Sequence, residues 1–437
     1  MSKMMPDLTK EILIFDGAMG TMIQRSKLLK PGDSPEMLNI SHPDLIQSIH
    51  KSYIAAGSKC IETNTFGGNS LKLEAHGLGN EKVRELNTAA VKNAKEAAKS
   101  GTGILVAGSM GPTGKLLEPL GDLTFKAAFN SFKEQATVLA GAGVDLLIIE
   151  TMSDILETKA AILAAIDLDL PVIATVSFME NGRLLTGQTP EMVASVLSGF
   201  PLLALGANCG LSAAGLIPIV AKLLTYSKLP VIAQPNAGKP SLSGDETVYL
   251  ESPREYADSC LELLKSGVRI IGGCCGTTPE HIKLLTSGLT NIRSGGHRPL
   301  ASDYLVGKGS LIPVAEISET EVYRFRPEPQ NQLWAALCQG NSDPLIDFLL
   351  ALDPNQIKVF QIEGPFLTDS DAANFQELLN LLVTYWPNPI SAGLNAGLLI
   401  EILLTQTPGR TLVMTDSNKP ELNRMISRFG GVFSAGE

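Results

Sequence analysis

The sequence predicts an α/β protein in which a (β/α)8 barrel is followed by a smaller α/β domain. Between residues 12 and 295, eight short apolar runs alternate with segments of helical periodicity, and eight such units are typical of a (β/α)8 barrel. Each run stops at a polar or glycine-rich turn, as buried strands do. The runs end at Ile14–Phe15, Cys60–Ile61, Val106–Ala107, Ile148–Ile149, Thr175–Val176, Leu205, Ala233 and Ile271.

Helical segments connect these runs. Residues 81–100 and 124–142 carry the clearest amphipathic pattern, with apolar side chains at the spacing of one helix face. An open, doubly wound sheet is the alternative architecture, but it rarely needs eight equal units. We therefore expect the barrel to span residues 8–298. Residues 299–310 contain glycine and serine and are expected to form a linker.

The remaining residues, 311–437, predict a small α/β domain whose role the sequence does not indicate. Strands are expected at 357–362 and 411–414, where apolar and β-branched residues cluster. Helices are expected at 371–384 and 419–429. We find no chemistry-bearing motif in this domain.

Composition excludes several classes of function. The 437 residues carry a net charge of -10, with a pI near 5.2, which argues against a nucleic-acid surface because such surfaces are usually basic. The apolar runs are too short to span a membrane. The first ten residues hold no apolar signal region, so we expect a cytoplasmic protein.

Three cysteines lie at the ends of predicted strands. Cys274 and Cys275 follow one apolar run and are flanked by glycines, and Cys209 ends another run. Active-site residues of (β/α)8 barrels gather at this edge, and flanking glycines permit the bend that brings two adjacent thiols to one point. Three thiolates with one vacancy are typical of a catalytic zinc site. The sequence therefore predicts zinc bound by these three residues.

Other interpretations of the cysteines stay open. Buried cysteines are common core residues, and we assign Cys60, Cys260 and Cys338 to packing. The adjacent pair could instead form a redox disulfide, although the third thiol would then have no role. A structural zinc site would need a fourth protein ligand. Asn236, at another strand end, is a weak ligand through its amide oxygen when substrate is absent.

The predicted zinc site favours one kind of chemistry. Coordination converts a substrate thiol, whose pKa is ordinarily near 8.5, into a thiolate. With three thiolate ligands the site carries a charge of about -1, and a fourth brings it to about -2. Such an electron-rich site is a poor Lewis acid for water but leaves a bound sulfur nucleophilic. Alkyl transfer to sulfur is therefore favoured over hydrolysis.

Acidic residues follow three of the strands. Asp16, Glu62 and Glu150 end the first, second and fourth runs. A rim carboxylate often only caps a helix or pairs with a lysine, but two that face one pocket would hold an ammonium group. Backbone N–H groups near Thr65, Ser109 and Gly111 could hold a carboxylate. The combination describes an amino acid with a side-chain thiol.

The turns at the strand ends resemble those of the homocysteine S-methyltransferases. The resemblance covers residues 8–295, and its first two turns are closest to the homocysteine-binding barrel of cobalamin-dependent methionine synthase. The motifs are Asp16-Gly17-Ala18-Met19-Gly20-Thr21, Glu62-Thr63-Asn64-Thr65-Phe66, Gly206-Ala207-Asn208-Cys209-Gly210 and Gly272-Gly273-Cys274-Cys275-Gly276-Thr277-Thr278-Pro279.

This resemblance implies a ligand set and a reaction. Homocysteine would be methylated to methionine, with methylcobalamin as the donor. The implied zinc ligands are Cys209, Cys274 and Cys275. The resemblance also implies Asp16 and Glu150 at the substrate amino group and Thr65 near the carboxylate. Gly17 and Ser109 are further substrate-binding residues that we expect from their places in the strand-end turns.

The chain departs from full-length methionine synthase after the barrel. The remaining residues are too few for both a folate-binding barrel and a cobalamin domain, and the signature Asp-x-His-x-x-Gly does not occur. We therefore expect a separate corrinoid protein to dock over the barrel rim and bring the methyl group. Two alternatives stay open. The donor could be S-methylmethionine or S-adenosylmethionine, or the chain could be a non-catalytic partner or regulator of a corrinoid protein.

Overall fold

The computed structural model describes residues 5–30, 32–243, 246–289, 299–300, 302–415 and 419–435. The chain divides into two units. The first comprises residues 1–116, 126–186 and 201–300, and the second comprises 117–125, 187–200 and 301–437. None of the helices among the described residues is both long enough and apolar enough to cross a membrane.

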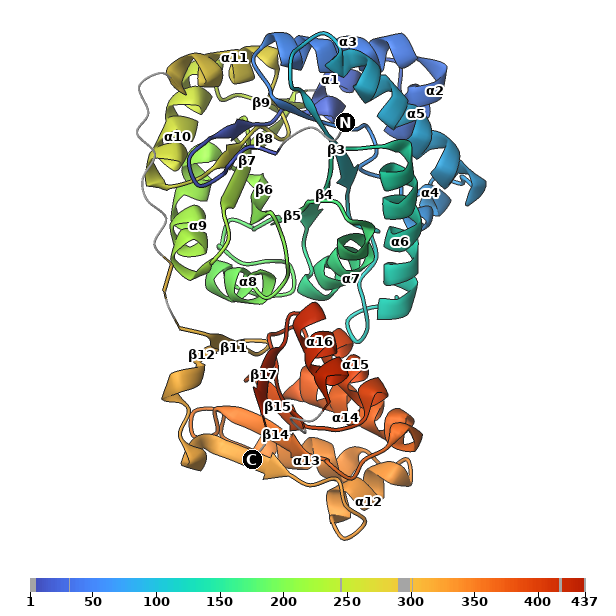
Figure 1. Cartoon of the computed structure of the whole chain (residues 1–437), viewed down its shortest axis with the longest axis vertical. Coiled ribbons are helices and arrows are strands. Elements are labelled where there is room, and N and C mark those ends of the chain that lie inside the picture. The colour runs from blue at the N-terminus through green and yellow to red at the C-terminus, as the bar shows by residue number, and fades with distance from the viewer. Residues whose placement is uncertain are drawn as a thin grey trace. The chain divides into compact units, whose positions relative to one another are not determined.

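An eight-stranded parallel sheet forms the centre of the first unit and confirms the predicted (β/α)8 barrel. All eight predicted runs are strands of this sheet (Figure 1). A parallel bridge between Phe15 and Cys60 joins the first strand to the second and closes the ring. The strands are β1 (Leu13–Ile14), β2 (Cys60–Glu62), β3 (Leu105–Met110), β4 (Leu146–Met152), β5 (Val172–Val176), β6 (Ala204–Ser212), β7 (Val231–Asn236) and β10 (Ile270–Ile271).

Helices alternate with these strands along the chain. The two helices with the clearest pattern, α5 and α6, begin and end within two residues of their predicted limits. The helices are α1 (Met19–Arg25), α2 (Leu38–Ser41), α3 (Pro43–Ala55), α4 (Ser70–Ala75), α5 (Glu81–Ala98), α6 (Phe125–Ala142), α7 (Ile155–Ala165), α8 (Pro190–Leu197), α9 (Ala213–Tyr226), α10 (Pro253–Ser266) and α11 (Pro279–Gly288), with 3-10 turns at Pro35–Met37 and Ile166–Leu168.

The interior of the barrel is a packed core. Parallel strands point alternate side chains inward, and buried apolar residues from all eight strand segments meet there. This filling makes the barrel a rigid support for the loops at its carboxyl rim. The core residues are Leu8, Leu13, Phe15, Cys60, Leu105, Ala107, Leu146, Ile148, Ile173, Ala204, Ile232 and Ile270.

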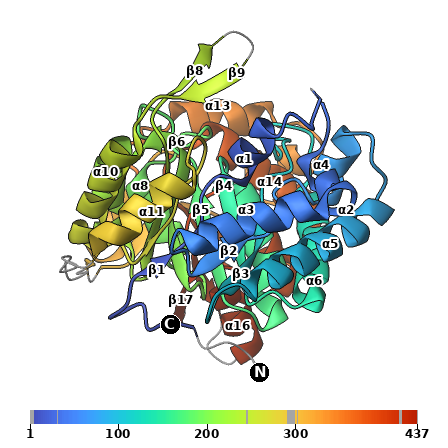
Figure 2. The same cartoon turned by 90° about the horizontal axis from the view of Figure 1, so that it is seen from above.

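One feature of the first unit was not predicted. A hairpin of two antiparallel strands, β8 (Pro240–Ser243) and β9 (Glu246–Tyr249), lies between β7 and α10 in the chain. It projects beyond the ring of barrel helices (Figure 2). Its strands are only four residues long, which is too short to show a clear period-two pattern.

The second unit contains a five-stranded parallel sheet in the order β13-β14-β15-β16-β17, which agrees with the predicted α/β class. Since consecutive strands are neighbours, right-handed crossovers place the connecting helices on one face of this sheet. The elements are β11 (Tyr304–Val306), β12 (Leu311–Pro313), β13 (Val322–Phe325), α12 (Gln332–Cys338), α13 (Asp343–Ala351), β14 (Val359–Glu363), α14 (Ala372–Tyr385), β15 (Ile390–Gly393), α15 (Gly397–Gln406), β16 (Leu412–Thr415), α16 (Pro420–Arg428) and β17 (Val432–Ala435), with 3-10 turns at Val314–Glu316, Glu319–Glu321 and Asp369–Asp371.

The expected linker, residues 299–310, is partly a strand. β11 lies inside it and pairs with β12, and Val306 also forms an antiparallel bridge to Arg410. Leu305 and Val306 are buried, so their apolar side chains attach this segment to the second unit. The predicted end of the barrel, residue 298, lies outside the described residues.

Candidate metal and substrate site

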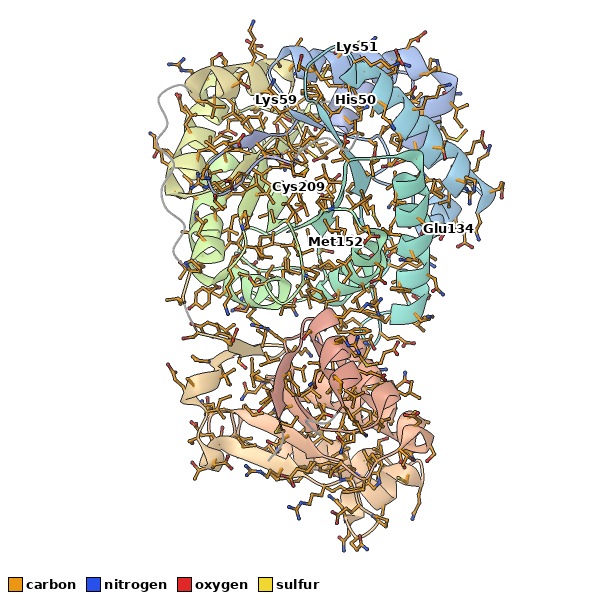
Figure 3. The ribbon with its side chains drawn as sticks, in the orientation of Figure 1. His50, Lys51, Lys59, Glu134, Met152 and Cys209 are labelled. Atoms are coloured by element: carbon orange, nitrogen blue, oxygen red, sulfur yellow. The ribbon has the colours of Figure 1, made fainter. Side chains whose placement is uncertain are left out.

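Three thiols from two distant segments meet at the carboxyl rim of the barrel. Cys209 lies in β6, inside the ring of helices (Figure 3), and Cys274 and Cys275 lie in the turn after β10. All three sulfur atoms are within 4.8 Å of one another, and Cys209 Sγ is 3.8 Å from Cys275 Sγ. A tetrahedral ion with Zn–S distances of about 2.3 Å separates its sulfur ligands by about 3.8 Å. The donor set and its spacing therefore fit zinc.

The backbone of Cys209 is held in an unfavourable conformation. Its φ is 58°, in the left-handed region that non-glycine residues rarely adopt. Thr151, at the end of β4, has φ 59°; for a β-branched residue this conformation is a marked outlier. Such strain costs of order 1–3 kcal/mol per residue and clusters at functional sites. Here it accompanies the turn that brings Cys209 Sγ to the other two thiols.

Without a metal ion, the three thiols do not ionise together. Hydrogen bonds with Cys209 and Cys274 lower the pKa of Cys275 to about 3. The hydrogen bonds that Cys274 shares with Cys209 and Cys275, together with burial, raise the pKa of Cys274 above its ordinary value. The cluster therefore holds one negative charge, and a divalent cation would stabilise further thiolates at this point.

Asn236 supplies a buried acceptor beside the cluster. It is the last residue of β7 and is 3% exposed. Its Oδ1 atom has no hydrogen-bond partner among the described residues, which is uncommon for a buried polar atom. The next residue, Ala237, donates its N–H to the carbonyl of Cys275 at 2.9 Å. The role of Asn236 as a weak fourth ligand stays a prediction.

Three carboxyl groups form a second cluster on the same rim. Asp16 and Glu150 are buried, and the Asp16 carboxylate accepts a hydrogen bond from the N–H of Glu62 at 3.1 Å. Burial raises the pKa of all three groups, and the charge of Glu150 raises that of Glu62 further. Gln234 donates from Nε2 to Glu62 Oε1 at 2.6 Å. Burial therefore favours protonated carboxyl groups in this cluster, and a substrate ammonium group would favour their ionised forms.

Asn208 joins the two clusters. Its Nδ2 atom lies 3.3 Å from Glu150 Oε2 and 3.9 Å from Cys274 Sγ. The same side chain accepts hydrogen bonds at Oδ1 from the N–H of Thr151 at 2.7 Å and from the hydroxyl of Thr175 at 2.8 Å. The Asn208 amide therefore lies between the acid cluster and the thiol cluster and contacts one member of each.

The predicted carboxylate-binding amides have other partners, which corrects that part of the sequence analysis. The N–H of Thr65 donates to Thr63 O at 2.8 Å, and the N–H of Gly111 donates to Phe66 O at 2.9 Å. The N–H of Ser109 donates to Thr63 Oγ1 at 3.1 Å. Turn closure at the rim uses these donors, because a buried N–H needs a partner.

Thr65 and Ser109 nevertheless shape the site. The Thr65 hydroxyl donates to Ser109 O at 2.7 Å, and the Ser109 hydroxyl donates to Glu150 Oε1 at 2.5 Å. Ser109 therefore orients the Glu150 carboxylate. Gly17 has a steric role, since an added Cβ there would lie 2.6 Å from Thr277 Oγ1 and 2.9 Å from the ring of Tyr53. A side chain at Gly17 would displace the turn that carries Asp16.

Some residues of the site were missed by the sequence analysis. Asn208 and Gln234 lie within predicted strand-end turns, but no motif distinguished their side chains from loop residues. Among the other cysteines, Cys60 and Cys260 are buried, as predicted, whereas Cys338 is exposed. Cys338 is the last residue of α12, and the core-packing prediction is wrong for it because the helix end faces solvent.

The loop after β3 is anchored by a buried carboxyl group. Glu157 Oε1 accepts hydrogen bonds from the N–H of Thr113 at 2.7 Å and from its hydroxyl at 2.6 Å. Burial raises the pKa of Glu157 to about 7, while the hydrogen bonds from Thr113 oppose the rise. The charge of Asp154 adds to the rise, and that of Lys72 opposes it. Glu157 is therefore largely protonated below pH 7 in the folded protein.

This anchor predicts a pH-dependent stability. Between pH 4.5 and 7 the unfolded chain loses the Glu157 proton and the folded chain keeps it, so the free energy of unfolding decreases as pH rises. Glu157→Gln keeps an acceptor for Thr113 but has no proton to lose. Relative to the native protein, the free energy of unfolding of Glu157→Gln should increase by roughly 3 kcal/mol from pH 5 to pH 8. The measurement is the difference in melting temperature between the two proteins at each pH. Glu134→Gln, an exposed change on α6 (Figure 3), should show no such trend; a flat difference for Glu157→Gln would contradict the prediction.

Comparison with known proteins identifies the family of the first unit. The sequence model of the homocysteine S-methyltransferase family matches residues 13–289. The chain belongs to the homocysteine S-methyltransferase family. Methionine synthase of Mycobacterium tuberculosis is 30% identical over 302 residues, which cover 65% of this chain and 25% of that protein. Methionine synthase of Mycobacterium leprae is 30% identical over 304 residues, with 66% and 25% covered. The match thus spans a quarter of these relatives.

Solved structures of this family show the same barrel. The homocysteine methyltransferase MmuM from Escherichia coli, in its metallated form, superposes with a TM-score of 0.54 and 27% identity, covering 64% of this chain and 96% of that one. Its oxidized form gives the same score and identity, with 97% of that chain covered. The predicted resemblance to the family is therefore confirmed.

Proposed function

We propose that this protein transfers a methyl group to the thiol of homocysteine and produces methionine. The observation that carries the proposal is a cluster of three sulfur atoms, all within 4.8 Å of one another, beside buried carboxyl groups. The amino nitrogen and the sulfur of homocysteine are four bonds apart. In the site, the single amide of Asn208 contacts both an acid and a thiol. The two clusters are therefore close enough for one substrate to reach both.

The zinc ligands in this proposal are Cys209, Cys274 and Cys275, with Asn236 as a weak fourth ligand when substrate is absent. A bound zinc ion would favour the thiolate form of the substrate and leave its sulfur nucleophilic. Asp16 and Glu150 would bind the ammonium group, and Ser109 and Asn208 hold the Glu150 carboxylate in place. These residues orient the substrate, because in-line attack on a methyl group depends chiefly on positioning.

The proposed reaction is a group transfer without a net redox change. The thiol of homocysteine loses its proton, and a sulfur–carbon bond to the methyl group forms. The bond between the methyl group and the donor breaks, and its electron pair stays with the donor. Methionine leaves the site as the product. A non-catalytic regulatory role gives no reason for the three thiols and the acid cluster to be assembled together.

We propose methylcobalamin on a separate corrinoid protein as the donor. Support comes from large apolar side chains exposed on loops that follow the barrel strands, which a docking protein would bury. Leu242 and Leu250 are 80% and 77% exposed on the segment after β7, and Leu185 is 57% exposed after β5. Met179 and Phe66, in the loops after β5 and β2, are exposed to a smaller degree. A macromolecular donor would cover such surface, whereas a small sulfonium compound would not.

A donor assay tests this function. The full-length zinc-loaded protein, incubated with homocysteine, should form methionine from methylcobalamin and none from S-methylmethionine or S-adenosylmethionine, as measured by mass spectrometry. Methionine from either sulfonium compound alone would move the donor to the alternative class. A protein that binds zinc but forms no methionine from any donor would support the regulatory alternative.

A further inference from the structure

The side chain of Gln234 reaches across the mouth of the barrel. Gln234 lies in β7 and Glu62 ends β2, and the strands β10 and β1 lie between these two in the ring. Gln234 nevertheless donates from Nε2 to Glu62 Oε1 at 2.6 Å. The carboxylate of Asp16, which follows β1, accepts the N–H of the same Glu62 at 3.1 Å. The amide group of Gln234 therefore lies at the acid cluster, although its backbone belongs to a strand on another part of the ring.

The neighbouring strands leave room for this reach. Gly272 directly follows β10, the strand that pairs with β7, and an added Cβ there would lie 2.8 Å from Asp16 O and 3.4 Å from Gln234 Cγ. On the other side, β6 places Asn208 directly opposite Gln234, and the Asn208 amide contacts Glu150. Two amides on paired strands therefore border the acid cluster.

The amide oxygen of Gln234 is a buried acceptor that lacks a donor. The residue is 2% exposed, and its Oε1 atom has no hydrogen-bond partner among the described residues. An ionised carboxylate has only acceptors, so Glu62 selects the NH2 side of the amide. The oxygen shares the plane of that NH2 group and therefore lies at the acid cluster as well. Because a buried acceptor without a donor is destabilising, this position favours a bound group that donates hydrogen bonds.

A substrate ammonium group has the donors that this arrangement needs. It carries three N–H groups, and the proposed function supplies two carboxylates, Asp16 and Glu150, as acceptors. A third acceptor completes the set. Another carboxylate would add negative charge to a group of three acids, whereas the oxygen of Gln234 adds an acceptor without adding charge.

We propose that Gln234 is a further substrate-binding residue, whose Oε1 atom accepts the third hydrogen of the homocysteine ammonium group. The inference rests on the proposed function and deepens it, because it adds a neutral acceptor to the two carboxylates. Through Nε2 the same side chain holds Glu62. Gln234 therefore recognises the amino group of the substrate and takes no part in the chemistry at sulfur.

Gln234→Met tests the proposal, because methionine keeps the length of the side chain and lacks the amide oxygen. In the full-length zinc-loaded protein under reducing conditions, the dissociation constant of homocysteine, measured by titration calorimetry, should rise about 10–100-fold, as expected for a hydrogen bond to a charged group. The dissociation constant of 4-mercaptobutanoate, which is homocysteine without its amino group, should change little. Zinc content should stay at the native level.

A double-mutant cycle separates a direct contact from an effect through Glu62. Glu62→Gln keeps an acceptor oxygen for Gln234 Nε2 and removes the charge. In this background, Gln234→Met should again weaken the binding of homocysteine by about the same factor. Loss of the effect would overturn the proposal, because it would show that Gln234 acts only by holding the Glu62 carboxylate.

Gln332→Met is the matched control, because it makes the same change at an exposed residue of α12 in the second unit. It should change neither dissociation constant. Equal weakening of both ligands by Gln234→Met, or unchanged binding of homocysteine, would overturn the proposal, as would a native protein that binds neither ligand. A native protein that binds homocysteine but forms no methionine from any donor would refute the proposed function, while the two dissociation constants would still decide the role of Gln234.

Discussion

A Cys274→Ala variant is expected to purify without zinc and to lose at least about a hundredfold in kcat/KM for homocysteine. Groups that only support a metal ligand typically contribute about 10–100-fold to metal affinity or activity, and loss of a ligand should exceed that range. The sulfur of Cys274 lies in the three-thiol cluster, and its removal also leaves the Asn208 amide without that acceptor. Zinc content by elemental analysis and methionine formation under reducing conditions are the measurements.

The matched control is Cys338→Ala, which removes an exposed thiol in the second unit. It should retain both zinc and turnover, so any loss in Cys274→Ala cannot be attributed to fewer cysteines. Circular dichroism and the melting temperature of zinc-free native protein give the reference for folding. A Cys274→Ala variant that turned over at the native rate without bound metal would refute the zinc assignment.

A Glu150→Gln variant is expected to raise the KM for homocysteine by at least about thirtyfold. Loss of one charge from a buried ion pair costs about 2 kcal/mol or more, and each factor of ten corresponds to about 1.4 kcal/mol. The glutamine keeps one acceptor oxygen and has an NH2 group in place of the other, so it can retain only one of the two hydrogen bonds from Ser109 and Asn208. Steady-state kinetics at a saturating concentration of the methyl donor measure the effect.

A substrate without the amino group distinguishes charge recognition from structural damage. With 4-mercaptobutanoate, the native protein and Glu150→Gln should differ little, because no ammonium group is present to lose its partner; this comparison is a double-mutant cycle between protein and substrate. Glu134→Gln, on the outside of α6 (Figure 3), is the control for loss of a surface charge. An equal penalty for both substrates would show that Glu150 supports the fold and does not bind the ammonium group.

The sequence was sufficient to predict the barrel and the convergence of the thiols. Apolar runs and helical periodicity located every strand of the eight-stranded sheet, because buried parallel strands require continuous apolar segments. In a closed parallel barrel all carboxyl strand ends lie on one rim. Cys209 and Cys274 therefore had to share an edge despite their separation in the chain, and the measured sulfur distances agree.

The second unit was predicted less completely. Strands near β14 and β16 and helices near α14 and α16 were identified, whereas β13, β15 and β17 were missed. These three strands are four residues long, as is β16, so length alone does not distinguish the missed strands from the one that was found. Their strand conformation depends on pairing with neighbouring strands, which is a non-local interaction.

By itself, the sequence determined which residues could do chemistry and that they lie on one rim, because strand order and periodicity depend on local pattern. Only the tertiary structure decided how the polar groups are paired. It directs the Ser109 hydroxyl to Glu150, uses the Ser109 N–H in turn closure, and places the Asn208 amide between Glu150 and Cys274. Hydrogen bonds depend on distances and directions set by packing between distant segments, and no local pattern in a chain encodes them.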